Sequence, residues 1–355
     1  MLGTDTTWRR VLARGLAKRA IFDRALAEIQ VALKADPGSY AAREDYVNIL
    51  VQAHDWQAVL KETDKELAEG HNEGFLYGKR GVARSQLRDR AGSLQEFDAG
   101  LAADVEAKDL DGIADIIRTI AQVITPDEAA ARLDKFPAGA GRQVLAIELA
   151  ILKRDSAAEV KAGRAVLAEP DAKHDQKVLA YRALAEGYIG LKDFQQAKQA
   201  WDQLLKLRPN DLVVLNNLAY LVAEEMGDPG NAKRYSQQAY NLVIRTGGAV
   251  RDVFDTHGWV LTLCGGHDAE QGLQILENLV DNNKDFTKGR LHLARSYVRQ
   301  TRPMISNAQS QLSIVRQQVQ QMEDKHLVID PELKDGIKRA QDEINRQNAA
   351  ASAGR

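Results

Sequence analysis

Cysteine, proline and aromatic residues are scarce in this chain of 355 residues, which contains one Cys, 8 Pro and 6% aromatic residues. The single cysteine, Cys264, excludes an intramolecular disulfide framework and a zinc site made of several thiolates. Long hydrophobic runs are missing as well, because no continuous apolar stretch approaches the roughly 18 residues that a membrane-spanning helix needs. We therefore expect a soluble protein without membrane insertion.

Charge of one sign is also missing. The chain has 48 Lys and Arg against 50 Asp and Glu, which gives a formal net charge of −2. Without a positive field over a whole domain, the counterion release that drives non-specific nucleic-acid binding is largely absent, so nucleic acid is not the expected partner. The first residues, MLGTDTTWRRVLARG, lack the uninterrupted apolar core of a signal peptide, which predicts a cytoplasmic location. A periplasmic location, or a place within a larger protein, stays an alternative.

Repetition is what the sequence does contain. The stretch from Tyr181 to Asp211 fits two short amphipathic helices joined by a turn. On the first helix, Leu184, Ala185 and Tyr188 share one face, and the small Ala185 lets a partner helix approach closely. Pro209 cannot continue a helix, so it ends the second helix and resets the chain for another unit.

This unit resembles the tetratricopeptide repeat (TPR), a helix-turn-helix family with a period of 34 residues. The same phase recurs in units that end at Pro37 and Pro170, and it recurs with one extra residue in the turn after Pro209. The resemblance implies an all-α fold, a right-handed superhelical solenoid of helix-turn-helix repeats. With Pro209 at position 32, the signature positions are occupied by Tyr181, Leu184, Ala185, Tyr188, Ala197, Trp201 and Leu204.

By this count about nine helix pairs fill the chain, and a final polar helix covers the last pair, since a stack of repeats needs a cap on its terminal apolar face. In the degenerate middle segment, Thr125 and Pro126 predict the start of a helix in a shortened unit. The predicted division is N-terminal TPR-like repeats at 1–107, degenerate TPR-like repeats at 108–177, C-terminal TPR repeats at 178–325, a polar capping helix at 326–347 and a disordered tail at 348–355.

Residue types that carry catalysis or bind metals do not converge in the sequence. The Gly-rich segment FPAGAGR around Gly139 lacks the GK[ST] that completes a phosphate-binding loop. His257 stands alone where a metal site needs several ligands, so we expect a structural histidine. Cys264 has no adjacent Lys or Arg to activate it, so we expect a packed, inert thiol. We predict no catalytic residue, no metal and no cofactor, and a protein that is not an enzyme.

The TPR resemblance implies that the first helices of the repeats line a concave surface where a peptide or protein binds. Side chains at these positions suit an extended partner, because they can hydrogen-bond its backbone and stack on its side chains. Ordinary solvated positions that bind nothing are the alternative. The TPR subclass that grips a C-terminal carboxylate is disfavoured, because Glu186 and Asp252 replace residues of its signature. The predicted binding residues are Arg182, Glu186, Asn216, Asn217, Tyr220, Glu224, Asp255 and Trp259.

The resulting hypothesis is a non-enzymatic TPR scaffold or adaptor that binds a protein or peptide segment in its concave groove. One alternative is a regulatory or docking fragment of a larger enzyme or of a secretion or assembly complex, which the lack of a polar cap before Thr6 would suit. The other is a self-assembling repeat protein, a homo-oligomer that covers its uncapped N-terminal repeat. Arg10, Arg14 and Lys18 form a basic stripe that either meets an acidic segment or is a solvated face.

Overall fold

The computed structural model describes residues 6–71, 73–248 and 250–353. Within these ranges every regular element is a helix, which confirms the predicted all-α repeat fold. No helix in the described ranges is both long and apolar enough to cross a membrane. The chain divides into two compact units, the first ending at Ala183 and the second beginning at Leu184. Helix α11 (His174–Gly190) runs from one unit into the other.

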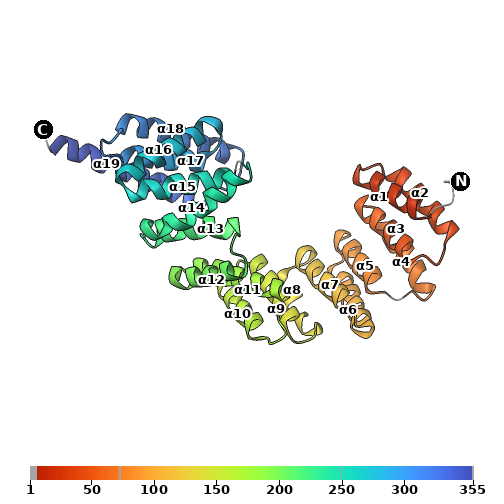
Figure 1. Cartoon of the computed structure of the whole chain (residues 1–355). Helices are drawn as coiled ribbons and strands as arrows, with labels where there is room; N and C mark the ends of the chain where they lie inside the picture. Colours follow the sequence, from red (N-terminus) through yellow and green to blue (C-terminus); the bar gives the residue numbers. More distant parts are fainter. Residues whose placement is uncertain (1–5, 72, 249, 354–355) are drawn as a thin grey trace. The chain divides into compact units, whose positions relative to one another are not determined.

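The first unit consists of helices that pack against their neighbours in chain order (Figure 1). It begins with three helix pairs: α1 (Thr6–Lys18) with α2 (Phe22–Ala35), α3 (Tyr40–Gln52) with α4 (Trp56–Ala68), and α5 (Gly74–Gln86) with α6 (Arg90–Ala107). It continues with α7 (Leu110–Val123), α8 (Pro126–Ala130), the 3₁₀ turn η1 (Leu133–Lys135), α9 (Ala140–Lys153) and α10 (Ser156–Ala168).

The second unit continues the same alternation of first and second helices. Its elements are α12 (Phe194–Leu207), α13 (Leu212–Tyr220) with the π turn η2 (Leu221–Glu225), α14 (Pro229–Arg245), α15 (Arg251–Cys264), α16 (Gly266–Asn282), α17 (Thr287–Val298), α18 (Ile305–Asp324) and α19 (Pro331–Ala353). In the described part of the chain, α1 to α18 therefore form nine successive pairs followed by one last helix, as the sequence predicts.

A recurrent turn joins the two helices of a pair. A residue with positive φ reverses the chain, and the Asp that follows caps the next helix. In the second pair, for example, Asp55 Oδ1 accepts a hydrogen bond from the backbone N–H of Ala58 at 3.1 Å. This bond satisfies one of the N–H groups that a helix start leaves without a partner. The same arrangement occurs at His54 and Asp55, Arg88 and Asp89, Arg154 and Asp155, and Lys192 and Asp193.

Small residues lie in the helix interfaces, where they allow close packing. Ala185 and Ala219 are fully buried, as the repeat pattern predicts. Gly81 of α5 lies against the ring of Phe97 of α6, and a Cβ at this glycine would be only 2.6 Å from Phe97 Cε1. The larger residues that the pattern assigns to the interior are buried too: Tyr188, Trp201 and Leu204.

The degenerate middle segment contains the shortened unit that the sequence predicts. Thr125 Oγ1 caps α8 by accepting a hydrogen bond from Glu128 N at 3.2 Å, and Pro126 occupies the first turn. The helix is only 5 residues long. The cap signal therefore marks the helix start correctly, although the second helix of this pair is reduced to little more than one turn.

The extra residue after Pro209 is accommodated differently from the sequence expectation, which placed it in the turn. Leu221–Glu225 form a π turn, closed by a hydrogen bond of 3.0 Å from Met226 N to Leu221 O. A π turn contains one residue more than an α turn, so the first helix absorbs the insertion. Glu224 lies on this widened turn.

The last helix corresponds to the predicted polar cap. Ala340 and Ile344 of α19 are buried in the core cluster that α17 and α18 help to form. The prediction of a disordered tail from residue 348 is corrected, because α19 continues to Ala353. Alanine has the highest helix propensity, and the segment Asn348–Ala353 is rich in it. Residues 354–355 lie outside the described residues.

Candidate functional site

Two of the eight predicted binding residues are buried in the second unit. Asp255 and Trp259, both on α15, are 1% and 0% exposed. The ring of Trp259 stacks on His292 of α17, with ring centroids 4.9 Å apart, and Asp255 Oδ1 lies 2.8 Å from His292 Nδ1. The prediction of both residues as direct partner contacts is therefore corrected. Their positions belong to the first helix, but side chains of α17 cover them.

Glu224 joins this cluster from the π turn. It accepts hydrogen bonds from Trp259 Nε1 at 3.0 Å, from Arg295 at 2.9 Å and from Arg339 of α19 at 2.8 Å. Burial acts to raise the pKa of Glu224, but the charge of Arg295 and the hydrogen bonds from Arg295 and Trp259 together lower it. Because the Glu224 side chain is 6% exposed and its carboxylate already bonds three side chains of the same chain, the prediction that it contacts a partner is also corrected.

Helix α19 closes this face of the second unit. Glu343 of α19 accepts two hydrogen bonds from Arg295, at 3.1 and 3.3 Å. Gly336 lies against Leu291 of α17, where a Cβ would be 2.5 Å from Leu291 Cδ2. A cavity of about 250 Å³ lies between α13, α17 and α19. On this side of the second unit, α19 thus packs over α17 and reaches Glu224.

The other predicted binding residues are placed differently. Asn216 and Asn217 are half-buried on α13, and Asn216 Oδ1 has no hydrogen-bond partner in the described part of the chain. Tyr220 is half-buried, with Lys288 Nζ 4.5 Å from its ring centroid. Arg182 and Glu186 lie on α11, where each interacts with other residues of the chain. Partner binding by these five residues stays a prediction.

An open cavity of about 420 Å³ lies in the first unit, away from the predicted binding residues. Three successive first helices, α3, α5 and α7, form it together with the end of α6. This position agrees with the inner surface that the repeat resemblance implies. The apolar and aromatic lining includes Tyr40, Val51, Phe75, Val82 and Ile116, and the charged lining is Glu44, Glu73, Lys79, Asp104, Asp109 and Asp115.

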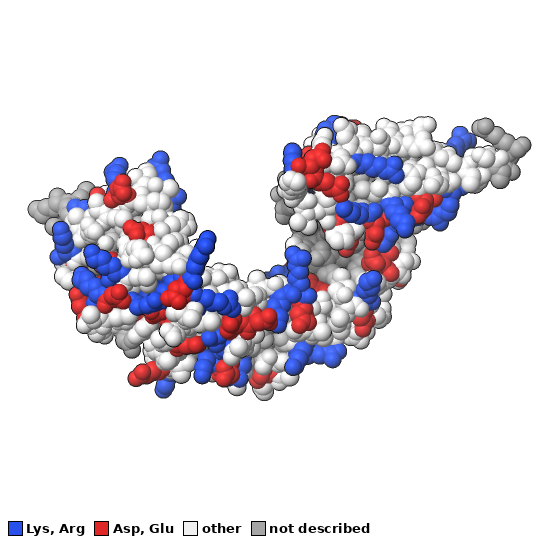
Figure 2. Space-filling view, turned by 180° about the vertical axis from the view of Figure 1, so that it is seen from behind, with Lys and Arg blue, Asp and Glu red and all other residues white. Residues whose placement is uncertain are grey.

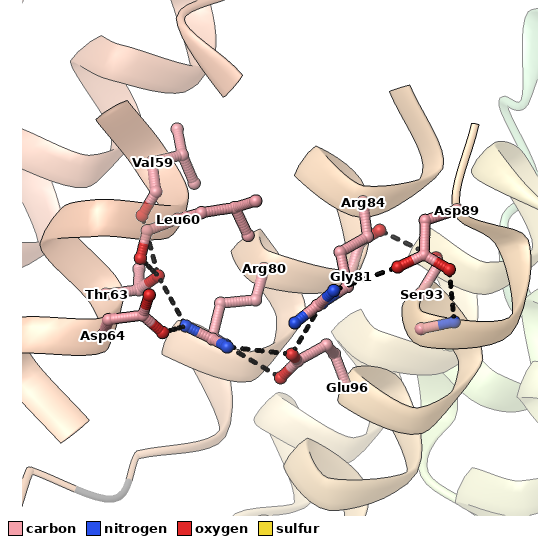
Figure 3. Close-up of polar contacts among 11 residues, drawn as sticks. Val59, Leu60, Thr63, Asp64, Arg80, Gly81, Arg84, Asp89, Ser93 and Glu96 are labelled. Atoms are coloured by element: carbon pink, nitrogen blue, oxygen red, sulfur yellow. Dashed lines mark hydrogen bonds and ion pairs between the residues drawn. The ribbon is translucent and has the colours of Figure 1, made fainter. Parts of the chain in front are cut away.

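Arg80 fixes the helix at the centre of this cavity (Figure 3). Its guanidinium donates to Glu96 of α6 at 2.8 and 3.0 Å and pairs with Asp64 of α4. Because these contacts tie α5 to the second helices on both sides, they define its rotation. Lys79 and Gly78, one and two positions earlier on the same helix, then line the cavity.

Asp104 is the least exposed carboxylate of the cavity, with 4% of its surface accessible. It accepts a hydrogen bond from the backbone N–H of Gly74, and a side chain at Gly74 or Gly112 would overlap its carboxylate. Its Oδ2 has no hydrogen-bond partner among the described residues. Burial, followed by the charge of Asp109, raises the pKa of Asp104 to about 6. This carboxylate is therefore buried without the contacts that normally stabilise its charge.

His257 and Cys264 have the environments that the sequence predicts for structural residues. His257 is 2% exposed and its Nδ1 lies 3.0 Å from Ser236 Oγ. Burial lowers the pKa of His257 to about 4, so the ring is neutral at pH 7. Burial raises the pKa of the Cys264 thiol, which disfavours the nucleophilic thiolate.

Two other charged features are already partnered. The basic stripe of α1 contacts α3, since Arg10 Nε lies 2.7 Å and Arg14 Nε 4.0 Å from the carboxylate of Asp45. Glu66, Glu69 and His71 are the group of metal-type ligands that lies close together in the described ranges, but Glu66 already pairs with His71 at 2.8 Å. On the face in Figure 2, positive and negative side chains are interspersed.

Comparison with known proteins finds solved structures that are similar at low sequence identity. No family model and no curated protein matches the chain. The C-terminal part of a TPR repeat-containing protein from Cytophaga hutchinsonii is 15% identical with a TM-score of 0.49, over 70% of this chain and 98% of that one. The Cut9–Hcn1 complex of the APC/C is 11% identical with a TM-score of 0.44, over 90% of this chain and 52% of that one. The fold assignment rests on the helix pairs of the chain itself.

Proposed function

We propose that the protein is a non-enzymatic interaction scaffold that binds a segment of a partner protein on the face formed by α3, α5 and α7. The observation that carries the proposal is the open cavity of about 420 Å³ across these three first helices. Its volume falls within the roughly 300–1,000 Å³ typical of ligand sites. The corresponding face of the second unit is partly covered by α19, which favours the first unit as the docking surface.

The lining of the cavity supports recognition of side chains. Val51, Val82 and Ile116 supply apolar walls. Tyr40 lies at the rim with 44% of its surface exposed and meets Phe75 edge to face, with ring centroids 5.3 Å apart. Rigid aromatic side chains beside an apolar cavity are typical of the few residues that dominate binding energy at protein interfaces.

Filling the cavity tests this proposal. Gly78 lies on α5, and a Cβ there would meet only Ile116 Cγ1 at 3.7 Å, an ordinary contact. Gly78→Leu therefore projects a side chain into the cavity with no change in charge. Gly15→Leu on α1 is the matched control, because nothing lies within 4 Å of its Cβ position. We expect partners retained from an extract of the source cells by the wild type and Gly15→Leu to be lost with Gly78→Leu.

If Gly78→Leu and Gly15→Leu retained the partner proteins equally well, a binding site at the face of α3, α5 and α7 would be contradicted. If Tyr220→Ala removed the partner instead, the site would lie on α13, as the sequence predicts. Sedimentation velocity tests the self-assembly alternative, since a monomer at every concentration excludes a homo-oligomer as the working form.

A further inference from the structure

We infer that the cavity of the first unit recognises a cationic side chain, lysine or arginine, of the bound segment. This inference rests on the proposed function, and it adds the chemistry of the ligand. Five carboxylates and one lysine line the cavity. Opposite charge at the site is therefore the first property that a partner must supply.

The carboxylates differ in how far the chain already satisfies them. Asp115 lies 3.3 Å from Arg118. Glu73 lies 3.7 Å from Arg43, although its Oε2, like Asp104 Oδ2, is buried without a hydrogen-bond partner among the described residues. Asp109 caps α7 by accepting a hydrogen bond from Gly112 N at 3.0 Å. By contrast, Glu44 and Asp104 form no ion pair within 4.0 Å in the described part of the chain.

Asp104 carries the argument, because it is 4% exposed and its Oδ2 has no hydrogen-bond partner among the described residues. A buried charged acceptor without a partner destabilises the fold. Glycines at 74 and 112 make the room for this carboxylate, since a Cβ at either would overlap it. A cation that enters the cavity would supply the missing hydrogen bond and compensate the charge.

The resident Lys79 does not fill this role. Burial lowers the pKa of Lys79, and the carboxylates that oppose this effect are Glu44 and Asp115, not Asp104. The negative potential also reaches the rim, where burial and then the charges of Glu44, Glu73, Asp109 and Asp104 raise the pKa of Tyr40.

The geometry favours an organic cation over a metal ion. In the described ranges, the metal-type ligands that come within 4.8 Å of one another are Glu66, Glu69 and His71, which do not line this cavity. A lysine or arginine side chain has an aliphatic stem that can pack on Val51 and Ile116 while its charged end reaches the carboxylates. The exposed ring of Tyr40 can stack on the same cation.

The test uses short acetylated peptides that differ only in a central Arg, Lys, citrulline or norleucine, with binding to the full chain followed by fluorescence anisotropy. Citrulline has the shape of arginine without its charge. We expect the Arg and Lys peptides to bind the wild type at least about tenfold more tightly than the citrulline peptide. Asp104→Asn should remove this preference, because Asn keeps an acceptor for Gly74 N–H and loses the charge. Asp111→Asn, on the exposed side of α7, should preserve it.

Three outcomes overturn the inference: no binding of the Arg or Lys peptide, equal binding of the Arg and citrulline peptides, or a preference that survives in Asp104→Asn. Circular dichroism melting verifies that each variant folds, and Glu44→Gln at a less buried position provides a second charge variant, expected to weaken the preference. Gly78→Leu separates the two proposals. If it blocks peptides that show no preference for a cation, the docking face stands and the cation inference fails. If it blocks nothing, the docking face itself fails.

Discussion

The inner faces of the two units differ in whether their buried charged side chains have hydrogen-bond partners. In the second unit, Glu224 and Glu343 enclose Arg295 with hydrogen bonds of 2.9 to 3.3 Å. In the first unit, Asp104 is as deeply buried but has a carboxylate oxygen without a partner in the described ranges. The difference arises because α19 supplies Glu343 to the second unit. Where the chain itself provides the complementary charge, the face formed by first helices is covered by the chain. Where it does not, the face is a candidate binding site.

Glycines show the same contrast in packing. A Cβ at Gly78 would enter the cavity of the first unit with its nearest contact at 3.7 Å. A Cβ at Gly272, between α15 and α16, would lie 2.8 Å from the backbone nitrogen of Thr262. A backbone atom cannot rotate away, so Gly272 is required by close packing whereas Gly78 leaves space.

The largest effect is expected from Arg295→Met in the closed network. Removing this cation leaves Glu224 and Glu343 buried with one partner fewer, which should lower the free energy of unfolding by about 3–5 kcal/mol. Guanidinium denaturation followed by circular dichroism measures this loss. Arg316→Met is the control, since Arg316 bonds Gln341 at an exposed site, and should change stability by less than about 0.5 kcal/mol. Equal losses of unfolding free energy in Arg295→Met and Arg316→Met would show that the buried network stabilises the fold no more than an exposed hydrogen bond.

Gly272→Ala should be the next most damaging change. The added methyl group meets backbone atoms of α15, so the helix pair must separate, at a cost of about 1–3 kcal/mol. A denaturation midpoint equal to that of the wild type would contradict the close approach of α15 and α16. Gly15→Ala on the open surface of α1 is the matched control.

Asp104→Asn should stabilise the chain at pH 7 by about 1 kcal/mol, after allowance for solvent screening. The folded pKa of about 6 lies above the ordinary value of 3.8, so ionisation of Asp104 opposes folding. This penalty appears as the pH rises above 3.8 and is complete above about 6. The other charged groups that line the cavity with Asp104 are Lys79, Glu44, Glu73, Asp109 and Asp115. The gain from Asn should therefore shrink as the pH falls from 7 toward 4. Thermal melts of both proteins across this range, with Asp111→Asn as control, check the sign.

The smallest expected effect is a gain from Gly78→Ala. Alanine in a helix interior is favoured over glycine by roughly 0.5–1 kcal/mol, and the cavity accepts its methyl group. A loss of stability would show that the wall of the cavity is more tightly packed than the distance to Ile116 indicates.

Much of the fold followed from local sequence. The spacing of Leu184, Ala185 and Tyr188, the stop at Pro209 and the cap at Thr125 each depend on contacts within a few residues, and each predicted its helix. The extra residue of the π turn was assigned to the loop, because a helix that widens by one residue has no local signal.

The candidate sites were less predictable. Repeat position identified Trp259 as an inner-face residue but not its coverage by His292, which is 33 positions away in the chain and belongs to another helix pair. Gly74 and Gly112 lie 30 and 8 positions from Asp104 in the chain, so nothing in the local sequence connects them with this carboxylate. Their meaning depends on the meeting of α5, α6 and α7.

The sequence by itself determined the helix pairs, their period and the residues that pack between the two helices, because periodicity, capping and proline stops act locally. Only the tertiary structure decided which inner face is closed and which is open. That outcome depends on where α19 packs and on which buried carboxylates find a cation, and both are long-range contacts that no repeat signature encodes.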